Sequence, residues 1–275
     1  MPELPEVETT RAGLKDRIVG QRLADWTQRV PALRWPIEIP ASLRGQRLTA
    51  LNRRGKYLLF EFPAGTLLVH LGMSGSLRLL TAPENPLRHD HVDLDFGAAS
   101  VRLNDPRRFG CVLWHPAGAP PHPLLAHLGV EPLGAGLSGR YLKDKARKRK
   151  VAVKSFIMDS RILVGVGNIY AAEALFLAGV RPSVAAGRLT LTAWTNLAAA
   201  IKQVLAHAVA VGGTTLRDFV NSDGKPGYFK QQLNVYGRAG EPCRRCGAAL
   251  RNQRLGGRAT VYCVSCQHRW GWPAL

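Results

Sequence analysis

Four cysteines in the last part of the 275-residue chain limit its folding more than any other feature of the sequence. They form two C-x2-C pairs, Cys243 with Cys246 and Cys263 with Cys266, with sixteen residues between the pairs. Four thiolates at this spacing can close a tetrahedral shell around Zn²⁺, which leaves no open coordination position for catalysis. Two disulfides are the alternative, and a reducing compartment disfavours them. The spacing therefore favours one structural zinc ion in a small C-terminal module.

The balance of charge indicates a polyanionic partner. The chain has 38 Lys and Arg against 19 Asp and Glu, a formal net charge of +19. So large an excess destabilises the folded state by self-repulsion unless a partner neutralises it. Seven positive residues lie between Arg140 and Lys150, and seven arginines decorate the cysteine module against one acid, Glu241. A solvated helix face is the alternative for the 140–150 run, but the overall excess favours a surface that faces phosphates.

The distribution of apolar residues indicates the compartment of the protein and the class of polyanion that it binds. No apolar run approaches the length of a membrane span, and the charged first residues are unlike a signal peptide. We therefore expect a cytoplasmic protein. No basic amphipathic helix with an aromatic face supports binding to an anionic membrane, so nucleic acid is the first candidate.

The first three residues suggest a nucleophile. If Met1 is removed, Pro2 carries a free secondary amine, and a free amino terminus has a pKa of about 8, roughly two units below that of lysine. Attack of such an amine on a carbonyl-like carbon gives a charged iminium, which is a strong electron sink. Glu3 follows directly and could deliver and collect protons. A Pro- and Glu-rich leader of no consequence is the alternative interpretation.

The residues after Glu3 predict a helix that ends near Gly20. Pro5 suits the first helical turn, and Glu6 and Glu8 complement the positive end of the helix dipole. The apolar residues that recur at nearly helical spacing are Leu4, Val7, Leu14 and Ile18. Pro2 and Glu3 should therefore project from the N-terminus of a buried helix, whose positive end would lower the pKa of the amine further.

The pattern from Leu23 to about His115 is that of short strands. Apolar runs at 57–62, 66–71, 76–80, 91–96 and 111–114 are separated by turn signals, which predicts an antiparallel sandwich or barrel. Cys111 lies in one of these runs and reads as an inert core residue. The Pro- and Gly-rich stretch 116–139 predicts a domain linker, and helices are expected at about 166–178 and 189–211.

Short motifs then follow one another through the whole chain. They are PELPEVET at 2–9, RGKY at 54–57, HLGMSG at 70–75, NDPRRFG at 104–110, GVGNIY at 165–170, DGKPGYF at 223–229 and VYGR at 235–238. With the cysteine module, they resemble the bacterial formamidopyrimidine-DNA glycosylase family, which repairs oxidised purines. The Pro-Glu-Leu start favours this branch over the related endonuclease VIII branch, which typically reads Pro-Glu-Gly.

The resemblance implies an α+β fold in three parts. Residues 1–131 would form the catalytic domain, an N-terminal antiparallel β-sandwich with a leading helix. Residues 132–236 would form a helical DNA-binding domain with a helix-two-turn-helix motif and the lesion-recognition loop. Residues 237–275 would form a zinc finger built on a β-hairpin.

The resemblance also implies the chemistry. In this family the residue that matches Pro2 attacks C1′ of the damaged nucleotide and expels the base, and successive eliminations then cut the strand on both sides. Glu3 matches the general acid and proton shuttle, and Lys56 matches a lysine that contacts phosphate and assists catalysis. The trio that fills the gap left by the flipped lesion matches Met73, Arg107 and Phe109.

Further matches concern binding of the DNA. The residues that bind backbone phosphates match His70, Asn168, Tyr236 and Arg258. The 213–225 loop corresponds to a lid over the flipped base, with Thr214, Thr215 and Arg217 as the expected contacts.

The implied protein is a zinc-containing monomer that acts on duplex DNA with oxidised bases or abasic sites, associated with the nucleoid and not with a membrane. Two other functions stay open. The first is an endonuclease VIII-like glycosylase for oxidised pyrimidines. The second is a non-catalytic zinc-ribbon protein that only binds DNA.

Overall fold

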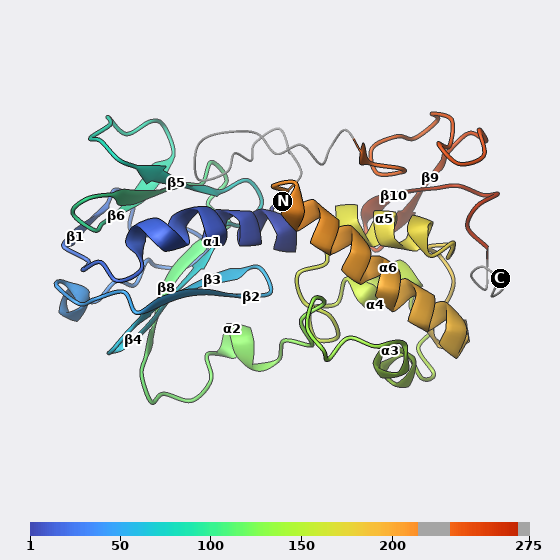
Figure 1. The fold of residues 1–275 in the computed structure, drawn as a ribbon, viewed down its shortest axis with the longest axis horizontal. Helices are drawn as coiled ribbons and strands as arrows, with labels where there is room; N and C mark the ends of the chain where they lie inside the picture. The colour runs from blue at the N-terminus through green and yellow to red at the C-terminus, as the bar shows by residue number, and fades with distance from the viewer. Residues whose placement is uncertain (214–231, 269–275) are drawn as a thin grey trace. The chain divides into compact units, whose positions relative to one another are not determined.

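The computed structural model describes residues 1–213 and 232–268 and divides into two compact units (Figure 1). Among these residues, the first unit contains 1–126 and 209–213, and the second contains 127–208 and 232–268. The change of unit after Ala126 falls inside the Pro- and Gly-rich stretch 116–139. The finer division into domains at 131 and 236 stays a prediction.

Helix α1 (Leu4–Ile18) opens the first unit, as the sequence predicts. Glu3 caps it in an extended conformation, and the Glu6 carboxylate accepts the backbone N–H of Glu3 at 2.8 Å. This bond satisfies one of the N–H groups near the helix start. The chain leaves the helix through Gly20, whose φ of +86° suits glycine. The four predicted apolar positions of α1 are fully buried.

Two antiparallel sheets of four strands form the rest of this unit (Figure 1). The first has the order β1-β6-β7-β5, with β1 Asp25–Gln28, β6 Asp90–Asp95, β7 Ser100–Asn104 and β5 Ser76–Leu80. The second has the order β2-β3-β4-β8, with β2 Ala50–Arg54, β3 Tyr57–Phe62, β4 Gly65–His70 and β8 Cys111–Pro116. A short 3₁₀ turn, η1 (Ala41–Leu43), precedes β2.

Three of these strands, β1, β2 and β7, were not among the runs that the sequence analysis singled out. Polar residues interrupt the apolar runs of these strands, and in β7 an ion pair explains the interruption. Arg102 is 4% exposed and pairs across the sheet with Asp93 of β6, with 2.8 Å between Arg102 Nε and Asp93 Oδ1. A buried arginine is tolerated in a central strand because its charge is paired and hydrogen-bonded.

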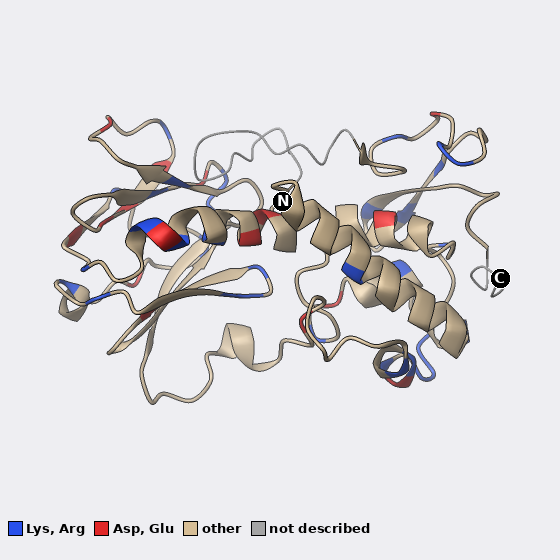
Figure 2. Ribbon diagram, in the orientation of Figure 1, with Lys and Arg blue, Asp and Glu red and all other residues tan. Residues whose placement is uncertain are grey.

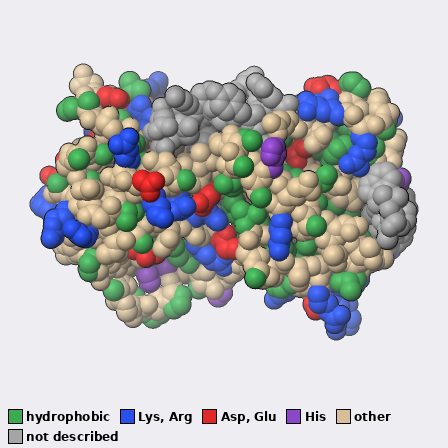
Figure 3. Space-filling model, viewed as in Figure 1, with side chains coloured by type: hydrophobic (Ala, Val, Ile, Leu, Met, Phe, Trp, Pro, Cys, Tyr) green, Lys and Arg blue, Asp and Glu red, His purple; other side chains and the backbone are tan. Residues whose placement is uncertain are grey.

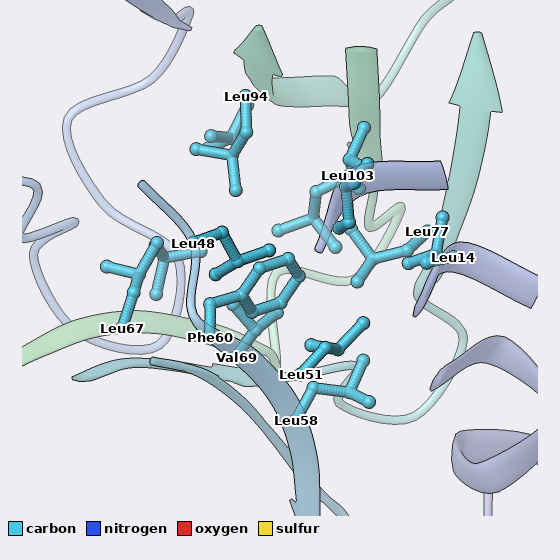
Figure 4. Packing of buried hydrophobic residues seen from close by; sticks show 14 of the residues in the cluster. Leu14, Leu48, Leu51, Leu58, Phe60, Leu67, Val69, Leu77, Leu94 and Leu103 are labelled. Atoms are coloured by element: carbon cyan, nitrogen blue, oxygen red, sulfur yellow. The ribbon is translucent and has the colours of Figure 1, made fainter. Parts of the chain in front are cut away.

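The core lies between the two sheets. Leu58 and Phe60 of β3 meet Leu94 and Leu103 of the opposite sheet, with Leu14 of α1 in the same cluster (Figure 4). The outer face of the β2-β3-β4-β8 sheet carries a second, smaller cluster. Its buried members are Leu68, Cys111 and Leu113, and it is covered in part by Leu124 and Leu125 of α2 (Pro123–Ala126).

Cys111 is the inert core residue that the sequence predicts. Its side chain is 1% exposed, and burial raises the pKa of the thiol to about 12. The thiol is therefore neutral and unreactive at physiological pH.

The second unit is built mainly of helices. They are α3 (Gly139–Lys145), α4 (Val153–Ile157), α5 (Asn168–Leu177), the 3₁₀ turn η2 (Ala186–Arg188) and α6 (Leu191–Ala210), and a strand pair follows, β9 (Arg251–Leu255) and β10 (Arg258–Tyr262). The helices expected at about 166–178 and 189–211 are confirmed as α5 and α6. Within the described residues, no helix has the length and apolar character to cross a membrane.

Candidate active site, phosphate contacts and metal centre

Pro2 and Glu3 lie at the start of α1, where the sequence places them. Pro2 is buried directly before the N-cap residue Glu3, which is 2% exposed. The positive end of the helix dipole therefore points at the Pro2 nitrogen. With Met1 attached, that nitrogen is an amide without nucleophilic character. Met1 itself is 36% exposed.

Gly213, the first residue of the predicted recognition loop, lies at the same helix start. Gly213 has a φ of +81°, and a Cβ built there would stand 3.3 Å from Oε1 of the buried Glu6. The three predicted contacts of that loop, Thr214, Thr215 and Arg217, lie outside the described residues.

Lys56 lies in the tight turn between β2 and β3. Gly55, with φ +58°, precedes it, and the guanidinium of Arg53 donates to the Gly55 carbonyl at 2.9 Å. Arg53 Nε also donates to Glu8 Oε2 of α1 at 2.8 Å. Burial tends to raise the pKa of Glu8, but hydrogen bonds from Arg11 and Arg53 outweigh it and hold that pKa below its usual range. Arg53 therefore ties the turn that carries Lys56 to the helix that begins beside Pro2.

His70 ends β4 with a defined protonation state. Burial, together with the positive charges of Lys56 and Arg34, lowers its pKa to about 4. Its Nδ1 accepts the backbone N–H of Gly72 at 2.9 Å, and the Tyr57 ring lies against it with 4.8 Å between centroids. In the neutral ring Nε2 therefore carries the hydrogen and is a donor.

Met73 and Phe109 lie on two loops whose backbones touch. A Cβ built on Gly72 would stand 2.5 Å from the nitrogen of Gly110, so only glycine permits this approach. The Asp105 carboxylate accepts the N–H of Gly110 at 2.8 Å and braces the second loop.

The three predicted wedge residues are all exposed. Met73 and Phe109 present 39% and 45% of their surface, which is unusual for large apolar side chains. The guanidinium of Arg107, also exposed, stacks on the Phe109 ring 4.8 Å from its centroid.

In the second unit, a buried lysine brings two predicted phosphate contacts together. Lys154 is 1% exposed, and its ammonium donates to Asn168 Oδ1 at 2.6 Å, to Thr260 Oγ1 at 2.8 Å and to the Ala259 carbonyl at 3.1 Å. Asn168 Nδ2 donates to the same carbonyl at 3.3 Å. The start of α5 is thus joined to β10 beside the exposed Arg258. Sequence reasoning missed Lys154, although it is the only charged residue in the run 151–157.

A buried carboxylate holds Tyr236. Glu173 of α5 is 2% exposed, and its Oε1 accepts the backbone N–H groups of Val235 and Tyr236, each at 2.9 Å. Its Oε2 accepts the backbone and side-chain amides of Asn234 at 2.9 and 3.0 Å. Helix α5 therefore carries Asn168 and also fixes the backbone at Tyr236.

The four predicted cysteines come together. All their sulfur atoms lie within 4.8 Å of one another, with 3.9 Å between Cys243 and Cys266 and 3.5 Å between Cys246 and Cys263. A tetrahedral site with Zn–S bonds of about 2.3 Å requires sulfur separations of about 3.8 Å. The geometry fits a single structural zinc ion, which four thiolates hold with no vacant position.

Models of three domains match the chain in sequence. The formamidopyrimidine-DNA glycosylase N-terminal domain matches residues 1–112, and the H2TH domain of the same enzymes matches residues 128–220. A zinc finger found in FPG and IleRS matches residues 240–269.

Complete proteins also match this chain over nearly its full length. Formamidopyrimidine-DNA glycosylases of Magnetococcus marinus and Methylococcus capsulatus are each 56% identical, over 97% of this chain and 99% and 100% of their own lengths. Among solved structures, the MutM (Fpg) protein of Thermus thermophilus has a TM-score of 0.88 and 38% identity, covering 97% of this chain and 98% of its own.

A variant of Lactococcus lactis Fpg in complex with DNA that contains Fapy-dG has a TM-score of 0.89 and 32% identity, covering 97% of this chain and 99% of that one. Relatives this similar over nearly the full length of both chains leave no doubt about descent. The chain belongs to the formamidopyrimidine-DNA glycosylase family.

Proposed function

We propose that this DNA repair glycosylase excises 8-oxoguanine and formamidopyrimidines from duplex DNA through an iminium at Pro2, and then cleaves the strand by β,δ-elimination. The observation that carries the proposal is the position of Pro2, buried at the positive end of α1 directly before Glu3.

The proposed reaction begins once Met1 is removed. The Pro2 nitrogen attacks C1′ of the damaged nucleotide, and the bond from C1′ to the base breaks with its electron pair leaving on the base. The nitrogen then loses its proton and the C1′–O4′ bond opens, which gives the C1′–N iminium, and Glu3 supplies the protons that the departing base and O4′ take up. The helix dipole opposes a positive charge on the free amine, which keeps its lone pair available. The C1′–N iminium then acidifies the C2′ proton. Loss of that proton breaks the C3′–O bond, and loss of the C4′ proton in a second elimination then breaks the C5′–O bond, so both phosphates leave.

Several side chains would hold the DNA during these steps. Neutral His70 offers Nε2–H to a phosphate, and Asn168 and Arg258 stand together at a second phosphate position beside Lys154. Lys56 and Tyr236 complete the proposed set of phosphate contacts. Phosphate contacts of this kind fix the register of the duplex without reading its sequence.

The exposed trio would fill the gap left by the flipped nucleotide. Extrusion of a base leaves unstacked surface and costs a few kcal/mol. Met73 supplies a flexible apolar plug, Phe109 a wedge between base steps, and Arg107 donors for the unpaired partner base. We further propose that Thr214, Thr215 and Arg217 contact the flipped base.

The proposed partner follows from what the Lactococcus relatives bind, which is DNA with Fapy-dG or an abasic site. We propose that the chain acts as a monomer in the bacterial cytoplasm, associated with the nucleoid, and that its domains end at 131 and 236. An enzyme for oxidised pyrimidines is the second candidate, and the experiments below distinguish it.

The first prediction concerns the nucleophile. Borohydride reduction of the mature protein on a duplex with an abasic site should give a covalent adduct whose peptide map places the link at Pro2. Pro2→Gly should lower the rate of trapping at least about a hundredfold, because the secondary amine is lost. Pro5→Ala, at the same helix start but without the terminal amine, is the matched control and should trap normally. An adduct on Lys56 instead would refute the mechanism.

The second prediction concerns the lesion. Under single-turnover conditions, 8-oxoguanine opposite cytosine should be released more than about tenfold faster than thymine glycol, a ratio within reach of differential contacts in one base pocket. Faster release of thymine glycol would favour the activity of the endonuclease VIII branch.

The third prediction concerns His70. The His70 ring has a pKa of about 4 in the free protein and is therefore uncharged above about pH 5. A bound phosphate raises this pKa, but because the starting value is low the ring stays uncharged near neutral pH. His70→Leu should weaken binding of an abasic-analogue duplex about tenfold, and this factor should stay constant within about twofold from pH 6.5 to 8. His115→Leu, in β8 of the same sheet, is the control. A factor that shrinks severalfold as pH rises would show that His70 binds as a cation.

The fourth prediction concerns zinc. Cys266→Ser should lower the zinc content from one ion per chain and weaken duplex binding at least about a hundredfold, because the cysteines share a cluster with α5 and Val235. The first unit has its own core, so its near-ultraviolet circular dichroism should persist. Cys111→Ala, outside the metal site, should retain zinc and binding. Tight binding after verified loss of metal would contradict a structural role.

A further inference from the structure

The second unit presents a concentrated positive surface that the proposed mechanism does not use. It consists of the exposed cations on α3, the turn after it and η2: Arg140, Lys145, Arg147, Lys148, Arg149, Lys150 and Arg188. We refer to these seven residues as the α3 patch. Asp144 is the one acid within it, and it pairs with Arg140 at 3.1 Å and Arg147 at 3.8 Å. Among the described residues, no carboxylate forms an ion pair with Lys148, Arg149 or Lys150.

Backbone hydrogen bonds fix the turn that carries these three residues. Gly187 donates to the Arg149 carbonyl and Ala186 to the Val151 carbonyl, each at 2.9 Å. A Cβ built on Gly187 would stand 2.9 Å from the Arg149 oxygen, so η2 packs closely beneath the turn. The positive charges are therefore presented by an ordered surface and not by a frayed chain end.

The backbone conformation of Lys148 is a second, independent indication that this surface has a function. Its φ is +59°, in the left-handed region that glycine and asparagine occupy at little cost. A lysine there carries backbone strain that a glycine would relieve, and such strain concentrates at functional positions. Arg108, with φ +52°, is a comparable case in the loop that carries the proposed wedge.

The α3 patch is separate from the phosphate position at Asn168 and Arg258. In Figure 1, α3 and the β9–β10 pair lie on opposite sides of the second unit, with α5 and α6 between them. Figure 2 marks Lys and Arg at both places, and Figure 3 shows blue side chains gathered at the lower edge, over α3. The two positive surfaces therefore face different stretches of any rigid polyanion.

We propose that the α3 patch is a second docking surface for duplex DNA, which binds the backbone of a neighbouring undamaged segment while the main site holds the lesion. The inference rests on the proposed function only in taking duplex DNA as the partner. Exposed Lys and Arg side chains can neutralise backbone phosphates whatever the base sequence. A second contact of this kind would let the protein pass from one DNA segment to another without full release.

The chemistry of the patch favours DNA over a lipid surface. Membrane-binding basic segments place aromatic or large apolar side chains beside their charges. Here Leu142 and Ala146, the apolar residues of α3 and its cap, are fully buried, and Tyr141 is engaged by a hydrogen bond to the Ile162 carbonyl at 2.8 Å. Val151 and Leu191, which are exposed and close in sequence to patch residues, are aliphatic and not aromatic.

The test uses the full-length protein saturated one to one with an unlabelled duplex that carries an abasic-site analogue. A labelled, undamaged duplex is then added, and its binding is followed by fluorescence anisotropy from 50 to 200 mM salt. The wild-type complex should bind this second duplex. The triple variant Lys148→Gln, Arg149→Gln and Lys150→Gln should bind it at least about tenfold more weakly, with a slope of log K against log salt reduced by up to about 2.7.

A matched control removes the same charge elsewhere. Lys15→Gln, Arg17→Gln and Arg47→Gln alter three exposed cations of the first unit and should leave binding of the second duplex within about twofold. Single-turnover excision should be unchanged in both triple variants, which shows that they are folded and keeps this test distinct from that of the proposed function.

Any of three results would overturn the proposal. The wild-type complex could bind no second duplex, or both triple variants could lose binding of that duplex equally. The third is that the Lys148, Arg149 and Lys150 variant binds the second duplex normally but loses binding to anionic phosphatidylserine vesicles.

Discussion

Burial of the first helix is the constraint on which the rest of the structure depends. Chain termini usually fray, yet Leu4, Val7, Leu14 and Ile18 are all fully buried against the sandwich. A terminal amine is a useful nucleophile only if its position is fixed, because small misplacement of a reacting group costs much of the rate. The apolar face of α1 fixes the position of Pro2, the proposed nucleophile, and Glu6 and the Glu8–Arg53 pair tie the helix start and the Lys56 turn into one rigid piece.

The charges of this protein fall into two groups with different tasks. The buried ones, such as Glu173 and Lys154, are satisfied by backbone groups and nearby side chains, and each fixes a segment that carries a proposed DNA contact. A buried charge without such partners would be strongly destabilising, so these bonds also specify the local conformation. The exposed charges are overwhelmingly positive, and their mutual repulsion is relieved when phosphates approach. The net charge of +19 is thus a property of the surface.

Local patterns in the sequence predicted much of this, and long-range contacts account for what they did not. The extent of α1, the main strands of the sandwich, α5, α6 and the cysteine cluster follow from spacing that a short window reveals. Lys154 could not be assigned, because its acceptors at Ala259 and Thr260 lie more than a hundred residues away in the chain. The same holds for Arg53 with Glu8 and for Glu173 with residues 234–236. The positive φ values of Arg108 and Lys148 could not be predicted from the residue types at these positions.

Helix α5 shows how these long-range contacts combine. Within ten residues it begins with Asn168, presents Ala172 and Phe176 to the cluster of Cys243, Cys263 and Cys266, and places Glu173 beneath the backbone of Tyr236. Asn168, Ala172 and Phe176 are spaced by four residues and so share one face of the helix. Zinc therefore acts on the proposed phosphate position at Asn168 without being a proposed DNA contact itself. By closing the cysteine cluster it fixes the strand pair against α5, and the strand pair supplies Ala259 and Thr260, which hold Lys154 against Asn168. In this way a metal with no open coordination position can determine the geometry of a proposed phosphate contact.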